Sequence, residues 1–468
     1  MSGTGLADLE ARYRARSLWL DGIESSLAPR PSLPGDVDCD VAIVGAGFTG
    51  LWAAYHLARA QADMRIVVCE REIAGFGPSG RNGGWVSGGL IGSADTYARE
   101  AGADAVLRAY RETYAAVDHV GEAVEREAID CGFRKGGSLF VATTQPQLAR
   151  LRARQHELDA IGLGEEDSRV LAPAESRAVV GVAGCLEAAY SPHCARIDPA
   201  RLVRGLAEAC ERLGVTIYER TPVTELGPRR LVTPHGSVTA DVVLQATESY
   251  SVQLPRQRLR YLPLYSLMIA TEPLPQHVWD EIGWTDGVVV SDMRHLFFYA
   301  QRTRDGRIAI GGRGAPYRLS RPIDDENERN AEVRGRLERV IRRHFPAAAS
   351  ARITHHWGGP LGVPRDWSMA VHFDRGSGFG WAGGYAGHGV VAANIAGRTL
   401  ADLVLGHDTD LVHLPWVGHR SRRWEPEPLR FVASRAIVRI LGSADRSEDA
   451  TGKPARRTRL LAPVLPPH

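Results

Sequence analysis

The feature that most constrains this chain is a glycine-rich turn between a short apolar run and a helical pattern. The apolar run 41–44 ends at Gly45, and Gly45, Gly47 and Gly50 have the spacing G-x-G-x-x-G. In such a unit the first glycine permits a tight turn, the second lets the backbone approach a pyrophosphate, and the third packs the helix against the strand. The free N–H groups at the helix N-terminus then bind the phosphates. The stretch therefore predicts a strand, a turn and a helix that bind a dinucleotide.

An acidic residue completes this unit. A second apolar run, 66–69, ends at Glu70, twenty residues beyond Gly50. A carboxylate here accepts hydrogen bonds from ribose hydroxyls and would repel a 2′-phosphate, so NADP is not expected. The glycines alone are also compatible with an ordinary tight turn. The flanking strand, helix and acid favour the nucleotide site.

Two later stretches are also rich in glycine. Residues 73–93 follow Glu70 directly. Because apolar residues are interleaved throughout, this stretch predicts backbone lying against a flat ligand rather than a flexible surface loop. Residues 379–398 repeat the order of strand, small-residue turn and long helix. An NAD dehydrogenase does not require this second inward-pointing helix N-terminus, whereas a reduced flavin is stabilised by it.

The composition is that of an ordinary globular protein. The chain has 468 residues, 44% hydrophobic and 24% charged, and this length predicts two interleaved domains. A net charge of +2 does not indicate a nucleic-acid partner, and we expect none. The six cysteines lack metal-binding spacing, so we expect buried thiols and no metal site. Neither a transmembrane run nor a signal peptide is found, so we expect a cytoplasmic protein; the oligomeric state stays open.

The order of helix and strand patterns divides the chain into five parts. Alternating patterns predict a nucleotide-binding domain, and four short strands predict a mainly antiparallel sheet in a second, substrate-binding domain. We expect an arm at 1–36, the nucleotide-binding domain at 37–254 with an insertion at about 94–190 that contributes to the second domain, the second domain at 255–350, a return to the first domain at 351–410, and a C-terminal helix and tail at 411–468. The C-terminal helix is expected to pack on the body, with membrane-surface binding as the alternative. From Ser443 onward we expect disorder.

Several motifs together resemble the D-amino-acid-oxidase-type FAD-dependent oxidoreductases, and within them the γ-glutamylputrescine oxidase branch. The resemblance covers roughly residues 17–440. It rests on Asp40–Leu57, Ser79–Gly84, Arg196–Pro199, Ala270–Pro273, Gly311–Arg313, Trp357–Gly359 and Gly384–Gly389.

The resemblance implies an α/β fold in which a Rossmann-like FAD-binding domain is interleaved with a mainly antiparallel-sheet substrate domain that covers the flavin. It also implies an enzyme that oxidises an amine. A hydride moves from the C–H next to nitrogen to flavin N5, water hydrolyses the imine to a carbonyl, and dioxygen reoxidises the flavin to give hydrogen peroxide. FAD is expected to be non-covalent, because tethered relatives use a His or a Cys that is missing here: no His occurs between Ile73 and Ser93, and no Cys after Cys210.

The resemblance also suggests site residues. Candidates for the substrate side of the flavin are four aromatic side chains, each with a place in the core of the sheet as the alternative: Tyr265, His295, Tyr299 and Trp357. The residues expected to bind FAD lie in the glycine-rich stretches and at nearby strand ends: Gly45, Ala46, Gly47, Thr49, Gly50, Glu70, Arg71, Ser79, Gly80, Arg81, Asn82, Gly83, Val223, Ala246, Thr247, Gly359, Gly384, Tyr385, Gly387, His388 and Gly389.

The substrate prediction depends on one missing arginine. Branches that oxidise α-amino acids carry a Gly-(Phe/Leu)-Arg-Pro segment whose Arg binds the substrate carboxylate. The corresponding segment here is Trp357-Gly-Gly-Pro360, with Gly359 in place of that Arg. We therefore expect a small-molecule amine without an α-carboxylate, or with a more distant acidic group, as in a γ-glutamyl-diamine. Candidates for binding such an anion, each with a surface position as the alternative, are Arg302, Arg313 and Arg318.

The electron acceptor is the least constrained part. Sarcosine-oxidase-like relatives use a Lys near flavin N5 to stabilise developing superoxide, whereas the only lysines here are Lys135 and Lys453, outside the strands of the second domain. Because an Arg or a protonated His could supply the same charge, we favour dioxygen, with an amine or amino-acid dehydrogenase as the alternative. A flavin monooxygenase is less favoured, because residues 383–389 lack its Gly-Asp motif. The sequence does not exclude a non-catalytic flavoprotein.

Overall fold

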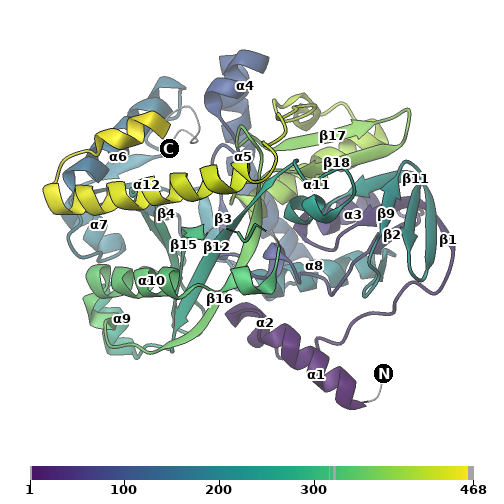
Figure 1. The fold of residues 1–468 in the computed structure, drawn as a ribbon, viewed down its shortest axis with the longest axis horizontal. Coiled ribbons are helices and arrows are strands. Elements are labelled where there is room, and N and C mark those ends of the chain that lie inside the picture. The colour runs from purple at the N-terminus through teal and green to yellow at the C-terminus, as the bar shows by residue number, and fades with distance from the viewer. Residues whose placement is uncertain (1–2, 316, 320–322, 462–468) are drawn as a thin grey trace.

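Two large β-sheets, seen side by side in Figure 1, form the body of the protein. The structure is a computed structural model that describes residues 3–315, 317–319 and 323–461. Both sheets contain strands from distant parts of the chain, so the two halves of the molecule are interleaved, as the sequence predicts.

The first sheet contains the predicted dinucleotide-binding unit. Its main path runs β17 (Ala370–Asp374), β18 (Phe379–Gly383), β11 (Gly236–Gln245), β1 (Val37–Val44), β2 (Ile66–Cys69) and β8 (Thr216–Tyr218), and β10 (Arg230–Thr233) and β9 (Glu225–Gly227) extend it from β11. From β18 to β8 all neighbouring strands are parallel. The continuous apolar runs of β1 and β2 follow from this arrangement, because both faces of a parallel sheet are buried.

Helices pack against one face of this sheet, and strands β9 and β10 with nearby loop residues cover the other. The helices are α3 (Phe48–Ala60), α5 (Ala103–Arg126), α8 (Pro199–Arg212) and α11 (Gly389–Leu405). Within this layer α3 and α11 pack closely, since a Cβ atom at Gly397 of α11 would lie 2.8 Å from the backbone nitrogen of Ala53. The N-termini of α3 and α11 follow the two predicted glycine-rich turns, after β1 and β18.

The second sheet is antiparallel except where β13 meets β4. Its strands are, in spatial order, β16 (Ile353–Val363), β12 (Leu262–Thr271), β15 (Ile308–Ala315), β14 (Phe298–Arg302), β13 (Val289–Asp292), β4 (Ser138–Ala142), β6 (Glu187–Ser191) and β5 (Arg169–Leu171). The predicted insertion thus supplies three of its strands. The return segment begins later than expected, because β16 is an edge strand of this sheet, paired with β12 by backbone hydrogen bonds. We propose a domain boundary after Val363 instead of at residue 350.

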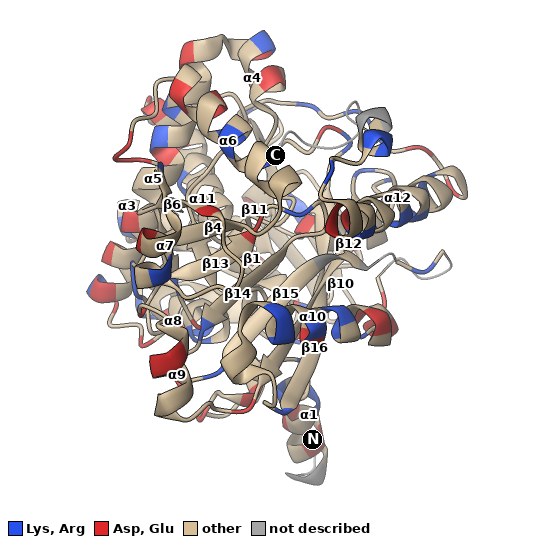
Figure 2. Ribbon diagram, turned by 90° about the vertical axis from the view of Figure 1, so that its left-hand side faces the viewer, with Lys and Arg blue, Asp and Glu red and all other residues tan. Residues whose placement is uncertain are grey.

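The remaining helices surround the second sheet and its junction with the first. They are α4 (Ala94–Ala101), α6 (Gln145–Ala160), α7 (Pro173–Val179), α9 (Gln276–Ile282) and α10 (Ala331–His344), and a small ribbon forms from β3 (Trp85–Ser87) and β7 (Cys194–Arg196). No helix within the described ranges is both long and apolar enough to cross a membrane. Figure 2 shows basic and acidic positions along the helices of one side.

The N-terminal arm is held against the body. It forms α1 (Gly3–Arg14) and α2 (Leu18–Asp21), and Ser17 accepts a hydrogen bond from the N–H of Leu20 as the cap of α2. The indole N–H of Trp19 donates to the carbonyl of Asn82 at 2.8 Å, and its ring meets Trp357 edge-on at 6.1 Å. The arm therefore contacts the glycine-rich stretch after β2 and the edge strand of the second sheet.

The C-terminal segment differs from the prediction. A helix, α12 (Leu429–Thr451), continues through the region expected to be disordered, and residues up to Leu461 include a further short turn of helix. Asp445 accepts hydrogen bonds from the backbone N–H groups of His295 and Leu296, each at 3.0 Å, and these contacts order the helix. The predicted disorder is wrong for residues 443–461; residues 462–468 lie outside the described part.

Candidate active site

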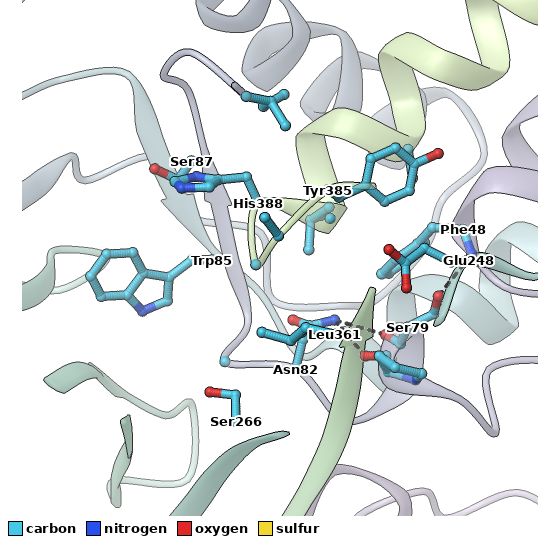
Figure 3. A pocket seen from close by; sticks show the side chains of 18 of the residues that line it. Phe48, Ser79, Asn82, Trp85, Ser87, Glu248, Ser266, Leu361, Tyr385 and His388 are labelled. Atoms are coloured by element: carbon cyan, nitrogen blue, oxygen red, sulfur yellow. Dashed lines mark hydrogen bonds between the residues drawn. The ribbon is translucent and has the colours of Figure 1, made fainter. Parts of the chain in front are cut away.

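A cavity of about 830 Å³ lies where the two sheets meet. Figure 3 shows Phe48, Ser79, Glu248 and Tyr385 at one end, His388 near the middle and Trp85 toward the other end. The first end is built from the turn before α3, the stretch after β2 and the turn before α11, whereas the second end is covered by the second sheet. The end lined by the glycine-rich turns therefore suits a nucleotide, and the end under the second sheet suits a smaller reactant.

The nucleotide end is organised by hydrogen bonds between the glycine-rich stretches. Glu70 accepts from the N–H of Ala46 at 2.9 Å, and Ser79 accepts from the N–H of Phe48 at 2.9 Å. The hydroxyls of Thr49 and Tyr385 are 2.9 Å apart and link the two helix N-termini. These bonds fix the position of α3 relative to α11.

Nearly all residues expected to bind FAD line this cavity. The exceptions are Gly50, Gly80 and Gly384, which lie behind the lining. A Cβ atom at Gly80 would overlap the carbonyl oxygen of Gly75, and one at Gly384, which has φ +84°, would lie 2.9 Å from Pro364. These glycines allow close backbone packing and do not face the cavity.

Arg81 lines the cavity, but its charge is directed into the protein. Its guanidinium is fully buried, lies 2.7 Å from a carboxylate oxygen of Glu328, and donates to the carbonyl of Gly358 at 3.0 Å and to the hydroxyl of Tyr250 at 3.2 Å. Glu328 also pairs with Arg16 of the arm at 2.8 Å. Arg81 therefore joins the cavity wall, the second sheet and the arm.

Glu248 is a cavity residue that sequence reasoning missed. One oxygen accepts the N–H of Gly362 at 3.0 Å, and the other has no hydrogen-bond partner among the described residues. Burial raises the pKa of this carboxyl to about 7, against the hydrogen bonds that lower it. Its position just after the carboxyl end of β11, at the edge of a parallel sheet where ligands bind, is the signal that could have found it.

Tyr299 lies at the other end of the cavity, as one of the four catalytic candidates. Its hydroxyl is 2.8 Å from that of Ser266, and its ring meets Trp85 edge-on at 6.1 Å. A Cβ atom at Gly83 would lie 2.6 Å from the ring, and one at Gly311 would overlap it. Two glycines thus make room for this ring, which places it next to the junction of the two sheets.

Tyr265 and Trp357, two further candidates, do not line the cavity. Tyr265 is buried, and its hydroxyl accepts the N–H of Asp324 at 3.1 Å. The indole N–H of Trp357 donates to the carbonyl of Arg81 at 2.9 Å, within the hydrophobic cluster that holds the arm. For both residues the structural alternative holds, because their polar atoms are bonded away from the cavity.

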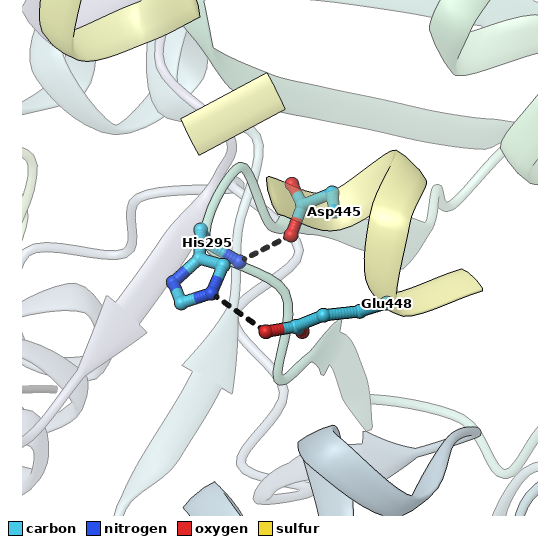
Figure 4. A group of neighbouring side chains, drawn as sticks. All are labelled: His295, Asp445 and Glu448. Carbon is cyan, nitrogen blue, oxygen red and sulfur yellow. Dashed lines mark hydrogen bonds and ion pairs between the residues drawn. The ribbon is translucent and has the colours of Figure 1, made fainter. Parts of the chain in front are cut away.

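His295, the fourth candidate, also lies outside the cavity lining. Figure 4 shows it with Asp445 and Glu448, whose ligand-type atoms lie within 4.8 Å of one another. Arg150 occupies the same cluster, 2.9 Å from Glu448, and both oxygens of Asp445 accept backbone N–H groups. A guanidinium and satisfied carboxylate oxygens do not suit a cation, so this cluster attaches α12 to the second sheet.

Two of the three arginines suggested for a distant anion, Arg302 and Arg318, do not line the cavity. The guanidinium of Arg302 covers the ring of Trp279 at 4.4 Å, and Arg318 is exposed and pairs with Glu326. The side chain of Arg313 lies outside the part of the chain that is described. Among the described side chains, a group that binds an anion in the cavity must therefore come from another position.

Comparison with known families agrees with this geometry. The model of the family "FAD dependent oxidoreductase" matches residues 40–403. This chain belongs to the FAD-dependent oxidoreductase family. It is an enzyme with FAD as its cofactor, as the sequence resemblance implies.

Relatives of this FAD-dependent oxidoreductase cover most of its length. Gamma-glutamylputrescine oxidoreductase of Escherichia coli is 30% identical over 85% of this chain and 92% of its own, and a probable oxidoreductase OrdL of Rhizobium meliloti is 32% identical over 81% and 86%. The crystal structure of glycine oxidase from Geobacillus kaustophilus superposes with a TM-score of 0.68 at 20% identity, over 82% of this chain and all of that one. The predicted two-domain fold is confirmed.

The residues of the cavity fit FAD. Gly45 has φ +105°, and a Cβ atom there would lie 2.8 Å from the carbonyl oxygen of Ala246, so only glycine allows this turn at the helix N-terminus. The unpaired oxygen of Glu248 suits a hydroxyl-rich ligand. We propose that Gly45, Gly47, Glu70 and the α11 turn hold the cofactor.

We expect the FAD to be released when the protein is denatured. The stretch after β2 contains no His, and the only cysteine that lines the described cavity is Cys69, which belongs to the nucleotide end. Acid precipitation should therefore leave the yellow colour in the supernatant. Colour retained in the pellet would show a covalent bond and contradict this prediction.

Proposed function

We propose that the enzyme oxidises an amine whose reacting carbon carries no carboxylate, as in an N-acylated diamine. The observation that carries this proposal is the wall around Tyr299, formed by Trp85, Ser266, Leu361 and Gly359, in which no described side chain offers a guanidinium to a substrate. The similarity to gamma-glutamylputrescine oxidoreductase of Escherichia coli supports an acylated diamine as the substrate class.

Arg81 does not replace the missing arginine. It lines the same cavity, but its guanidinium is fully buried and paired with Glu328 at 2.7 Å. Turning it toward a substrate carboxylate would leave Glu328 in the interior with only Arg16 as its partner. An α-amino acid would therefore bring an unpaired carboxylate into an aromatic pocket, which is costly.

The chemistry requires the amine to be neutral, so that its lone pair assists loss of the hydride. When bound, FAD would supply the hydride acceptor, and dioxygen would take up the electron pair with two protons to give hydrogen peroxide. Trp85, Tyr299 and Leu361 exclude water and so lower the pKa of the bound ammonium group. The Ser266 hydroxyl holds the Tyr299 phenol in place at 2.8 Å. The imine product reacts with water to give a carbonyl compound.

A dehydrogenase with another acceptor is the second candidate. In the described chain neither lysine lines the cavity, and Lys135 pairs with Asp118 at the surface. This observation favours a slow reaction with dioxygen. His388 lines the middle of the cavity, where a protonated imidazole would supply the missing charge, and we therefore retain dioxygen as the proposed acceptor.

Anaerobic mixing with putrescine or an N-acylputrescine should bleach the flavin rapidly, whereas ordinary D- and L-α-amino acids should reduce it at near-background rates. Stopped-flow absorbance measures both reactions, and admission of air to the reduced enzyme then measures the oxidase step. Fast reduction by a simple α-amino acid would overturn the substrate proposal. Negligible reoxidation by air would assign the enzyme to the dehydrogenases.

A further inference from the structure

The cavity continues past Tyr299 across the face of the second sheet. Backbone pairing places Tyr299 of β14 opposite Ser291 of β13, Ser291 opposite Phe140 of β4, and Phe140 opposite Ala189 of β6. All four residues line the cavity. Because residues paired directly across a sheet point to the same face, they form one row in which aromatic and small side chains alternate. This row is the floor of an extended arm of the cavity.

Helix α6 lies over this arm and carries three arginines in two turns. Arg150 pairs with Glu448 at 2.9 Å and donates to the carbonyl of Met293 at 2.7 Å, and Arg152 donates to Glu187 at 3.0 Å. Arg154, one turn after Arg150, is the one that lines the cavity. Among the described residues no carboxylate lies within ion-pair distance of it.

The surroundings of Arg154 suit an anion. Its guanidinium carbon is 4.3 Å from the centre of the Phe140 ring, so the ring holds the flat group in place. Tyr110 and Tyr114 line the same part of the cavity. Glu157 lies there as well, but its side chain is exposed, and water and salt screen its charge.

The other charges of this arm neutralise each other. Asp292 and Arg294 both line the cavity, with Asp292 only 3.3 Å from the Arg294 guanidinium, and Arg294 also reaches Asp449 at 2.8 Å. Among the described side chains of this arm, Arg154 is therefore the cation whose charge is left for a ligand.

The length of the arm limits what can reach Arg154. Neighbouring strands are about 4.8 Å apart, so Phe140 lies roughly 10 Å from Tyr299 along the row. An extended chain advances about 1.2 Å per bond, so roughly eight or nine bonds cover this span. The carboxylate of an α-amino acid, attached to the reacting carbon, cannot extend that far.

We propose that Arg154, stacked on Phe140, binds a carboxylate at the far end of the amine substrate, eight or nine bonds from the oxidised carbon. This inference rests on the proposed amine oxidation and adds a specificity-determining residue to it. The substrate class is then an amine joined through an uncharged linker to a terminal carboxylate. A planar guanidinium binds such a group with two parallel hydrogen bonds.

Two probes of equal length test the inference. N-glutarylputrescine ends in a carboxylate, whereas N-pentanoylputrescine ends in a methyl group. The wild-type enzyme should prefer the glutaryl compound, and Arg154→Gln should lower the ratio of their kcat/KM values about 10- to 100-fold, mainly through KM. Arg154→Lys keeps the charge without the planar fork and should restore part of the ratio. FAD content and Tm confirm that each variant is folded.

Arg152→Gln is the matched control, because it removes one positive charge from the same helix outside the cavity. It should leave the ratio unchanged. Equal effects of Arg154→Gln on both probes, or no preference of the wild type for the glutaryl compound, would overturn the inference. Failure of every amine to bleach the flavin would instead overturn the proposed function, so the two failures are distinguishable.

Discussion

Replacing Gly50 with alanine should give a colourless protein without FAD. A Cβ atom at Gly50 would overlap the carbonyl oxygen of Gly45 and lie 3.2 Å from a methyl carbon of Ile43. Neither atom can move, because one is the backbone of the turn and the other belongs to the buried strand β1. The helix α3 must shift away from the strand, which we expect to cost about 3 kcal/mol and to displace the N–H groups that face the pyrophosphate.

The measurements are the ratio of flavin absorbance to protein absorbance and the free energy of unfolding. Gly335→Ala is the control, because this glycine lies within α10 and a Cβ atom there would only meet Arg339 at 3.6 Å. The same substitution should there stabilise the protein by up to about 1 kcal/mol and leave the FAD content full. A yellow and equally stable Gly50→Ala variant would disprove the role of this glycine.

Replacing Arg81 with methionine should destabilise the protein by about 3–5 kcal/mol and weaken FAD binding. The substitution removes the 2.7 Å ion pair with Glu328 and leaves the acceptors on Gly358 and Tyr250 without this donor. A buried carboxylate that keeps only Arg16 as its cation is the main source of the loss. Denaturant unfolding and flavin fluorescence, which rises when flavin is released, measure the two effects.

Arg352→Met is the matched control for this prediction. Arg352 is largely exposed and pairs with Glu272 at 3.1 Å, so its loss should cost no more than about 1 kcal/mol. Adding Glu328→Gln to Arg81→Met should recover part of the lost stability, because it removes the uncompensated buried charge. Equal losses of stability in Arg81→Met and Arg352→Met would show that the buried ion pair stabilises the protein no more than the exposed one.

The nucleotide end of the cavity was predictable because its information is local. Three short segments carry it: the turn at Gly45–Gly50, the acid at Glu70 and the later turn before α11. Each can be recognised from a few consecutive residues without knowledge of the rest of the fold. The mainly antiparallel second sheet was also predictable from its short strands and turns.

The substrate end was not predictable in the same way. Its floor combines Phe140, Ala189, Ser291 and Tyr299, which come from four strands and become neighbours only through the register of the sheet. Sequence patterns identify aromatic residues but not which face they occupy, so Tyr265 and Trp357 were equally good candidates until their bonding was known. Arg154 is part of a charged helix whose pattern indicates an exposed surface.

The prediction of a disordered C-terminal tail was wrong for a related reason. Its polar composition from Ser443 onward suggests disorder, but Asp445 and Glu448 form hydrogen bonds or ion pairs with segments 150 to 300 residues earlier in the chain. Composition alone carries no information about partners at that separation.

The interleaved sheets also determine when this protein can acquire its cofactor. The dinucleotide turn after β1 is complete only when β18 and α11 have joined it, roughly 360 residues later in the chain. At about 5–20 residues per second, a ribosome needs roughly 20–70 s to make that interval. Throughout this time the helix α3 lacks its neighbour α11, although β2 and β11, the strands that pair with β1, are made before α11. Flavin insertion is therefore a late event in biogenesis, following synthesis of the second sheet rather than accompanying growth of the first.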